Sequence, residues 1–428
     1  MTKFQLILTG IFGVFIIGGV IVFSAYRGSS EQKVTVEVWG TLPANIFNRI
    51  IETTRFYNSE DIGVVYTEKS EEEFDQSFIE ALASGIGPDL FLLSSDKIIK
   101  HLNKILLIPN QVFTERQFKD TFIEGAETFR SPEGTIAMPV SVDPLVMYWN
   151  RSIFNEARVT QPPKYWDEFY SLAKTITQKD GALNIQRSAV AMGEYANISH
   201  AKEIISTLAM QAGTSITDKW QNGRIQSVFN FNTENKPVMP AFAAVSFYTE
   251  FSNPAKSSYS WNRSLPLSNN YFLSGDLALY FGYASELSLL QYKNPNLNFD
   301  VAKVPSSRDQ SDFDVFGKFW GLAITKSSKV QNAAYTVAST LSLETAEDWS
   351  EATSLPPVRR NLLSRKQTDS YKSVFYDGAI RARGWLDPEP KSSDSAFRNM
   401  IESITSGRSS ISDAITGAST ELNALLAK

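Results

Sequence analysis

Asp89-Leu90-Phe91-Leu92-Leu93 is the stretch that decides the fold, because an unbroken apolar run follows a single carboxylate. Such a run is typical of a strand that is covered on both faces of a sheet. Two strands are predicted before it: residues 34–38 alternate apolar and polar, and residues 63–66 are short and largely apolar. Helices are predicted between them, over 44–57 and 70–85. The order strand, helix, strand, helix, strand predicts an α/β fold with a parallel sheet.

Local signals support these two helices. Phe47, Ile50 and Ile51 lie on one face of the first helix. Ser70 and a glutamate three residues later have the spacing of a capping box, and Gly85 can end the second helix. Further helices are predicted over 166–177, 199–212, 239–251, 329–341 and 410–426, and a loop rich in Ser, Asn and Pro over 253–270.

The N-terminus is predominantly apolar. No side chain from residue 4 to residue 23 is charged, and about 20 apolar residues are needed to cross a membrane. A secretory signal has a shorter apolar region, and Ser24-Ala25 could serve as its cleavage site. We therefore expect residues 1–27 to be a membrane anchor or signal segment, with an uncleaved transmembrane helix favoured, and residues 28–33 to be a linker.

Size and composition exclude several classes of protein. A chain of 428 residues is too long for one ordinary core and predicts two lobes. The net charge of -5 and the lack of a Lys/Arg run argue against a nucleic-acid partner. Because the chain has no cysteine, it can form no disulfide, thiolate nucleophile or cysteine-ligated metal site, and no N-terminal cysteine can carry a lipid.

The sequence contains no convincing catalytic or cofactor motif. Neither a phosphate-binding P-loop nor a G-x-S-x-G nucleophile elbow is present. The two histidines, His101 and His200, are isolated and are interpreted as surface or hydrogen-bonded residues. The carboxylate pairs Asp312/Asp314 and Asp387/Glu389 imitate a glycosidase pair, but such pairs are frequent in loops. We therefore expect a protein that is not an enzyme and that carries no cofactor or metal.

A series of short motifs, in order along the chain, resembles the extracellular solute-binding proteins of family 1, which include the maltose-binding proteins. The motifs are Gly87-Pro88-Asp89-Leu90-Phe91, Ile136-Ala137-Met138-Pro139, Met147-Tyr148-Trp149-Asn150-Arg151-Ser152-Ile153-Phe154, Pro162-Pro163-Lys164-Tyr165-Trp166-Asp167-Glu168-Phe169, Phe272-Leu273-Ser274-Gly275-Asp276-Leu277-Ala278-Leu279, Lys326-Ser327-Ser328-Lys329 with Asn332-Ala333-Ala334, and Leu355-Pro356-Pro357-Val358-Arg359. The chain departs from the family pattern at Tyr165, at Leu279 and in the missing lipid-bearing cysteine.

The resemblance implies a periplasmic-binding-protein-like α/β fold, with two lobes, a ligand cleft and a hinge. Residues 34–142 plus 306–343 are expected in lobe 1, and residues 143–305 plus 344–428 in lobe 2. Open α/β sheets bind ligands at the carboxyl ends of their strands. Closure of the two lobes over the ligand would be a hinge motion.

Eight residues are candidate ligand contacts, because they follow predicted strands or lie where the family places contacts. Aromatic rings suit the apolar faces of a sugar, and Asp suits its hydroxyls. The candidates are Trp39, Asp96, Asp143, Tyr195, Trp261, Tyr283, Trp320 and Trp385. Most have a structural alternative: core packing for Trp39, Tyr283, Trp320 and Trp385, a helix N-cap for Asp96 and hinge hydrogen bonding for Asp143.

The leading functional prediction is a substrate-binding component of an ABC importer. Its expected partners are a small solute, with a carbohydrate preferred, and the permease subunits in the membrane. The protein is expected to be a monomer, anchored to the cell membrane with its soluble domain outside the cytoplasm. Three alternatives remain open: a binder of another solute such as a polyamine, phosphate ester or iron complex, an anchored glycoside hydrolase, and a module that presents solute to a sensor.

Overall fold

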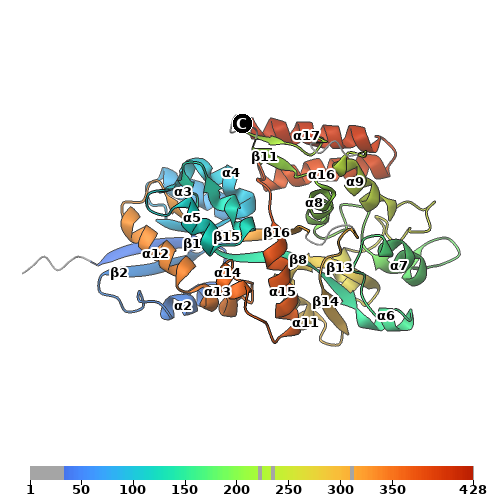
Figure 1. The fold of residues 1–428 in the computed structure, drawn as a ribbon, viewed down its shortest axis with the longest axis horizontal. Helices are drawn as coiled ribbons and strands as arrows, with labels where there is room; N and C mark the ends of the chain where they lie inside the picture. Colours follow the sequence, from blue (N-terminus) through green and yellow to red (C-terminus); the bar gives the residue numbers. More distant parts are fainter. Residues whose placement is uncertain (1–32, 220–223, 233–236, 309–312, 428) are drawn as a thin grey trace, which may run out of the picture.

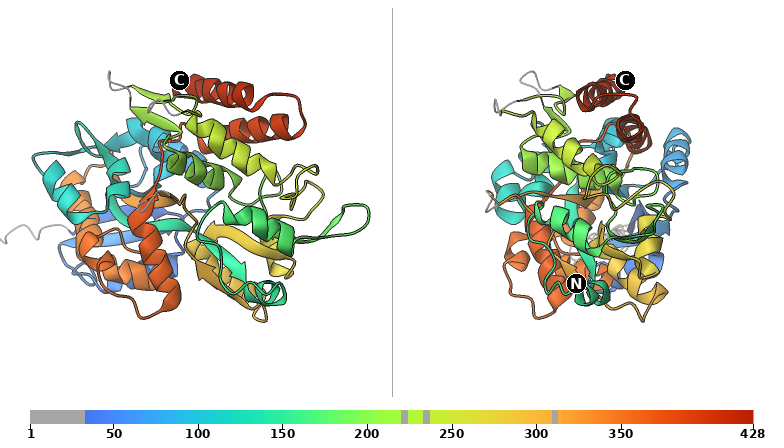
Figure 2. Two further views of the ribbon diagram at one scale, coloured as in Figure 1. Left: turned by 45° about the vertical axis from the view of Figure 1, so that its right-hand side comes forward. Right: turned by 90° about the vertical axis from the view of Figure 1, so that its right-hand side faces the viewer.

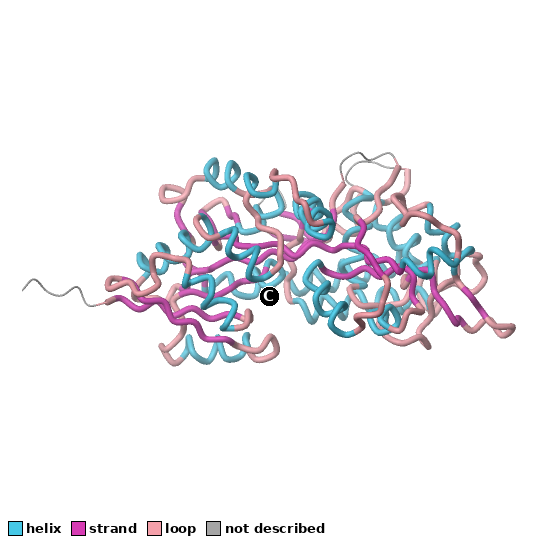
Figure 3. Tube along the Cα trace, turned by 90° about the horizontal axis from the view of Figure 1, so that it is seen from below, coloured by secondary structure: helices cyan, strands magenta, loops and turns pink. Residues whose placement is uncertain are grey.

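One mixed β-sheet runs through both halves of the molecule (Figure 1). The computed structural model describes residues 33–219, 224–232, 237–308 and 313–427. The strand order along the sheet is β2-β1-β3-β15-β8-β13-β10-β9. Viewed from below, the two lobes lie side by side and strands pass between them (Figure 3). The predicted two-lobed α/β architecture is therefore confirmed.

Lobe 1 is built on the parallel sheet that its sequence predicts. β1 pairs with β2 and β3 in parallel, with Val38 opposite both Tyr66 and Leu90. The strands of this half are β1 (Val34–Gly40), β2 (Ile62–Glu68), β3 (Leu90–Ser94) and β4 (Ile105–Leu106), with a small separate sheet of β5 (Ile108–Pro109), β6 (Arg130–Ser131) and β7 (Gly134–Thr135). β3 is buried along its whole length, as its unbroken apolar run predicts.

Helices cover this half of the sheet. They are α2 (Ala44–Glu52), α3 (Phe74–Ala83), α4 (Ile98–His101), α5 (Glu115–Thr121), α12 (Gln331–Leu343), α13 (Ala346–Thr353) and α14 (Arg360–Leu363), with short 3-10 turns η1 (Ser95–Lys97), η2 (Leu102–Lys104) and η3 (Glu124–Phe129). Gly85 follows α3 with φ +72, the left-handed conformation that ends a helix at little cost to glycine. This confirms the stop signal in the sequence.

Two long antiparallel strands join the lobes. β8 (Met138–Asn150) and β15 (Val315–Thr325) pair with each other, and Lys318 lies opposite Asp143. β16 (Ala382–Arg383) adds a short parallel pairing to the start of β15, and α15 (Ser370–Arg381) packs on β8 beside it. Asp143 is thus a residue of a connecting strand, held between the two halves.

Lobe 2 surrounds the far end of β8. β8 pairs with β13 (Leu277–Tyr283) and β14 (Phe299–Ala302), and β13 pairs with β10 (Ile185–Val190), which ends the sheet with β9 (Gln178–Lys179). The helices are α6 (Arg151–Glu156), α7 (Glu168–Ile176), α8 (Ala201–Ala212), α9 (Pro240–Glu250), α10 (Ser268–Leu273), α11 (Leu287–Lys293), α16 (Pro390–Thr405) and α17 (Ile411–Leu426), with the turn η4 (Ala284–Glu286). α16 and α17 lie side by side at the outer edge, next to the hairpin of β11 (Thr217–Lys219) and β12 (Ile225–Ser227) (Figure 2).

Two hydrophobic cores match the two lobes, but the boundary differs from the predicted one. Trp349, Val358 and Leu363 were assigned to lobe 2, whereas they pack in the core of lobe 1 with Phe47 and Val142. The chain therefore stays in lobe 1 from α12 through α14, and α15 packs against both cores, with Ala379 in the core of lobe 1 and Phe375 in that of lobe 2. The order of the motifs along the chain does not determine in which of the two cores these residues pack.

The predicted anchor, residues 1–27, lies outside the described residues. Within the described ranges no helix is both long and apolar enough to cross a membrane.

Candidate functional site

Trp39 lies at the end of β1 and faces a lysine. Its indole Nε1 donates to Glu37 Oε1 at 2.7 Å, and Lys69 Nζ lies 4.2 Å from the centre of its ring. The side chain is almost fully buried. A solute that stacked on this ring would first have to displace Lys69.

Asp96 lies on η1, directly after β3, as expected for a polar group at the end of a strand. Its Oδ2 is 3.2 Å from Lys318 Nζ, while Oδ1 is buried and has no hydrogen-bond partner among the described residues. Burial opposes ionisation, but Lys318, Ser94 and Lys202 together outweigh it, so the pKa of Asp96 lies below its usual value. An ionised carboxylate with one unused oxygen is ready to accept a hydrogen bond from a ligand.

Asp143 occupies the centre of β8, where the strand passes from one lobe to the other. Its Oδ1 accepts a hydrogen bond from the backbone N–H of Ser285 at 3.0 Å. Burial raises the pKa of Asp143 to about 6. The observed contact is the hinge hydrogen bond that the sequence left open as one alternative.

Tyr283 closes β13 beside a histidine and two glutamates. Its hydroxyl donates to Glu203 Oε1 at 3.4 Å, and its ring meets the ring of His200 edge-on at 4.8 Å. His200 Nε2 is 2.6 Å from Glu286 Oε1. Burial lowers the pKa of His200, but the contact with Glu286 outweighs it and leaves the pKa raised. His200 is therefore a hydrogen-bonded histidine, which agrees with its interpretation from the sequence.

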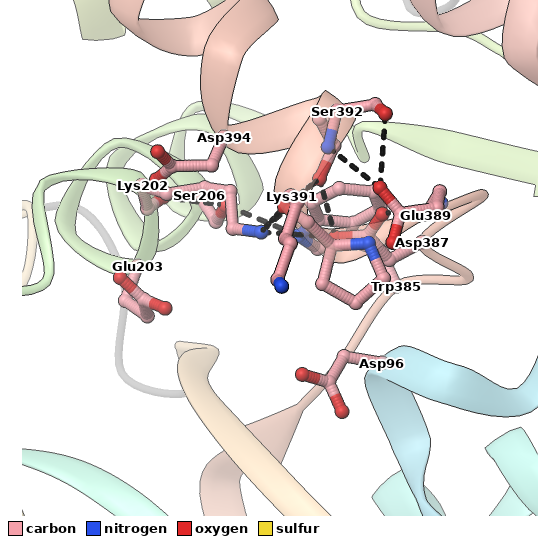
Figure 4. A network of polar contacts seen from close by, with 12 residues as sticks. Asp96, Lys202, Glu203, Ser206, Trp385, Asp387, Glu389, Lys391, Ser392 and Asp394 are labelled. Carbon is pink, nitrogen blue, oxygen red and sulfur yellow. Dashed lines mark hydrogen bonds and ion pairs between the residues drawn. The ribbon is translucent and has the colours of Figure 1, made fainter. Parts of the chain in front are cut away.

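Lys202 forms a polar network that sequence reasoning missed, and Glu203 beside it was missed as well. Lys202 Nζ binds Asp387 Oδ2 at 3.0 Å and Ser393 Oγ at 3.1 Å, which ties α8 to the start of α16 (Figure 4). Glu203 lies outside this network, and no dashed contact joins it to the other residues drawn (Figure 4). The available signal was two adjacent charged residues opening an otherwise apolar helix.

Trp385 and Trp320 each have a lysine against the ring. Trp385 donates from Nε1 to Ser206 Oγ at 3.1 Å, and Lys202 Nζ lies 5.6 Å from its ring centre. Lys318 Nζ lies 5.0 Å from the ring centre of Trp320 on β15. Trp385 is nearly fully buried and Trp320 is partly exposed. Lys202 and Lys318 thus belong to the same region as Asp96 and connect the predicted residues.

Tyr195 and Trp261 are buried in lobe 2. The hydroxyl of Tyr195 donates to Asp394 Oδ1 at 2.6 Å. Trp261 is 0% exposed and donates from Nε1 to Asn197 Oδ1 at 3.1 Å. The loop that carries Trp261 folds back onto the core, so the ring packs instead of facing solvent. The structure therefore does not bring Trp261 to the same surface as Asp96.

The charged groups around Asp96 include both acceptors and donors of hydrogen bonds. Within the described ranges, no group of three or more His, Asp or Glu side chains has the geometry to hold a metal ion. Asp96 from lobe 1 and Glu203 from lobe 2 provide acceptors, while Lys202 and Lys318 provide donors. Two lobes that present polar groups from strand and helix ends define a binding protein of the two-lobed type.

The comparisons with known proteins name the family. The model of the bacterial extracellular solute-binding proteins matches residues 40–346. This chain belongs to that family. Its members bind solutes and are not enzymes, which sets aside the anchored glycoside hydrolase, and the family is extracellular, which places the described part of the chain outside the cytoplasm.

Solved structures of sugar-binding proteins share the fold. A cyclic α-maltosyl-1,6-maltose binding protein from Arthrobacter globiformis superposes with a TM-score of 0.74, at 18% identity, over 92% of this chain and 99% of that chain. The sugar-binding protein MalE from Xanthomonas citri gives 0.72, at 17% identity, over 92% and 98%. At these identities the likeness shows the fold alone.

A curated relative covers less of the chain. A binding protein of Brucella abortus is 27% identical over 110 residues, which are 25% of this chain. The match spans only about a quarter of the length of that relative (26%).

Proposed function

We propose that this protein is the substrate-binding component of an ABC importer and that it binds a carbohydrate between its lobes. The observation that carries the proposal is a set of charged groups from both lobes: Asp96 of lobe 1 pairs with Lys318, and Lys202 of lobe 2, which pairs with Asp387, lies near enough for its charge to lower the pKa of Asp96. Charged acceptors and donors match the many hydroxyl groups of a sugar. The structural relatives include proteins whose solved complexes contain maltotetraose or cycloalternan.

The proposed contacts are the predicted residues other than Tyr195 and Trp261, which pack in lobe 2. They are Trp39, Asp96, Asp143, Tyr283, Trp320 and Trp385, joined by Lys202, Glu203 and Lys318. Tyr195 donates a hydrogen bond to Asp394, and Trp261 packs in the core of lobe 2. Because lysines cover the rings of Trp39, Trp320 and Trp385, we infer that hydrogen bonds dominate and that stacking follows lysine displacement.

Delivery follows from the connection between the lobes. β8 and β15 are the long strands that join them, so rotation about these strands would close the lobes over the solute. A solute shifts the equilibrium toward closure only if it binds the closed form more tightly. The closed monomer would then dock on the permease subunits, with residues 1–27 holding it at the membrane.

Isothermal titration against a panel of neutral oligosaccharides, a polyamine, a phosphate ester and a short peptide tests the solute. We expect binding of an oligosaccharide, weakened about tenfold or more by Asp96→Asn and by Glu203→Gln, because each loses a charged hydrogen-bond acceptor. Glu115→Gln, on the exposed face of α5, is the matched control and should leave affinity unchanged. Binding of the polyamine or peptide with no sugar bound would overturn the carbohydrate assignment.

A further inference from the structure

An ion pair joins the two lobes next to the network of Lys202 and Asp387, since Glu389 N donates to Asp387 Oδ1 at 3.1 Å. Lys100 belongs to α4 of lobe 1, and Glu389 precedes the first turn of α16 in lobe 2. Lys100 Nζ lies 3.1 Å from Glu389 Oε1, and the two side chains are only 26% and 28% exposed. Half-buried pairs are screened less by water and salt than pairs on the open surface.

The lysine is held in place by its own lobe. Asp75 Oδ2 lies 2.8 Å from Lys100 Nζ, and Asp75 Oδ1 accepts from His101 Nε2 at 3.0 Å. His101 is fully buried and meets the rings of Phe78 and Phe91 edge-on. The fixed imidazole orients Asp75, and Asp75 orients the ammonium toward lobe 2.

The glutamate is held by lobe 2 in the same way. Glu389 Oε2 accepts from Ser392 N at 2.8 Å and from Ser392 Oγ at 2.9 Å, which caps α16 and leaves Oε1 for Lys100. The segment that carries Glu389 is tied to α8 by Lys202 and Asp387. Asp387 and Glu389 resemble a carboxylate pair in the sequence, but they bind different lysines: Asp387 binds Lys202 and Glu389 binds Lys100.

We propose that Lys100 and Glu389 form a latch that holds the lobes together on the side of α4 and α16. Rotation that moves these helices apart must break the pair. A surface ion pair usually loses most of its gain to side-chain entropy, but both partners here are already ordered within their own lobes. The inference rests on the proposed motion of the lobes and does not depend on the identity of the solute.

Spin labels across the latch test it without any solute. The full-length chain has no cysteine, so Glu72→Cys at the start of the α3 region and Ser395→Cys on α16 can be labelled selectively. Both positions are exposed, Glu72 in lobe 1 and Ser395 on α16 of lobe 2. Electron–electron dipolar spectroscopy should then show Lys100→Met lowering the ratio of short to long distances about two- to fivefold. Lys100→Arg should retain the short distances, because it keeps the charge.

Two controls decide the outcome. Lys119→Met removes a lysine that pairs with Glu115 within lobe 1 and should leave the distances unchanged. Glu389→Gln should lengthen them, and the double variant with Lys100→Met should add nothing further. Distances in Lys100→Met that equal those of Lys119→Met, or effects of Lys100→Met and Glu389→Gln that simply add, would overturn the latch. If Lys100→Met lengthens the distances and no sugar binds in the titration, the latch is supported and only the carbohydrate proposal is contradicted.

Discussion

Asp143 accepts a hydrogen bond from the backbone N–H of Ser285 at 3.0 Å, and this bond fixes the connecting strand β8 to the turn after β13. The carboxyl is 8% exposed, and burial raises its pKa to about 6 from an ordinary value of 3.8. Asp143, on a strand that joins the two lobes, therefore changes its charge in mildly acidic solution.

The first prediction concerns the pH dependence of stability. The folded state holds the proton of Asp143 more tightly than the unfolded chain, so this residue favours folding below about pH 4 and loses that contribution as the pH rises through about 6. Asp143→Asn cannot ionise. The free energy of unfolding of Asp143→Asn, relative to that of the wild type, should therefore increase from pH 4 to pH 7 by up to about 3 kcal/mol.

Thermal melts of both proteins across this range measure the difference. Asp120→Asn, which changes an exposed carboxylate on α5, should give a nearly constant difference from the wild type. A constant difference for Asp143→Asn as well would mean that Asp143 is not the titrating group.

Trp261 provides the second prediction, because its complete burial makes it a core residue. Trp261→Ala should lower the free energy of unfolding by about 3–5 kcal/mol, as expected when a large aromatic side chain leaves a cavity. Trp261→Phe keeps much of the ring but removes the donor to Asn197, so a cost of about 1–3 kcal/mol is expected. Urea unfolding gives both values. Loss of solute affinity in Trp261→Ala at unchanged stability would place the ring at the ligand instead.

The sequence predicted the scaffold more fully than the site. The apolar run of β3 and the glycine after α3 decide local structure, so the parallel sheet and its helices followed directly. The position of Asp96 directly after a strand could be predicted, because the end of a strand is a local property. Trp261 was misleading as a loop residue, since the path of a loop over the core depends on contacts distant in sequence.

The charged network was harder to predict for the same reason. Lys202 meets Asp387 across 185 residues of chain, and Lys318 meets Asp96 from a distant part of the sequence. A lysine in a strand or at a helix start looks like an ordinary surface residue until the fold supplies its partner. No periodic pattern in the sequence marks such a pair.

Lys202 and Asp387 carry the third prediction. Asp387 is 2% exposed, so Lys202→Met leaves a buried carboxylate without its cation and should cost about 3–5 kcal/mol. Adding Asp387→Asn removes the uncompensated charge and should recover most of this loss. A double-mutant cycle from urea unfolding measures the coupling. If the double variant is as unstable as the sum of the single variants, the two groups do not stabilise each other.

The fourth prediction uses two glycines in different surroundings. A Cβ on Gly125 of η3 would lie 2.1 Å from the backbone oxygen of Ala382 and 2.3 Å from Cζ of Phe319, so backbone between η3 and β16 must move. Gly125→Ala should therefore lower the free energy of unfolding by about 3 kcal/mol, at the upper end for overpacking. Gly417 lies on the exposed side of α17 with no atom within 4 Å of an added Cβ. Gly417→Ala should raise the free energy of unfolding by up to about 1 kcal/mol through helix propensity. Urea unfolding of the two variants compares the same methyl group in a closed and an open position, and a neutral Gly125→Ala would show that η3 is not packed tightly against β16.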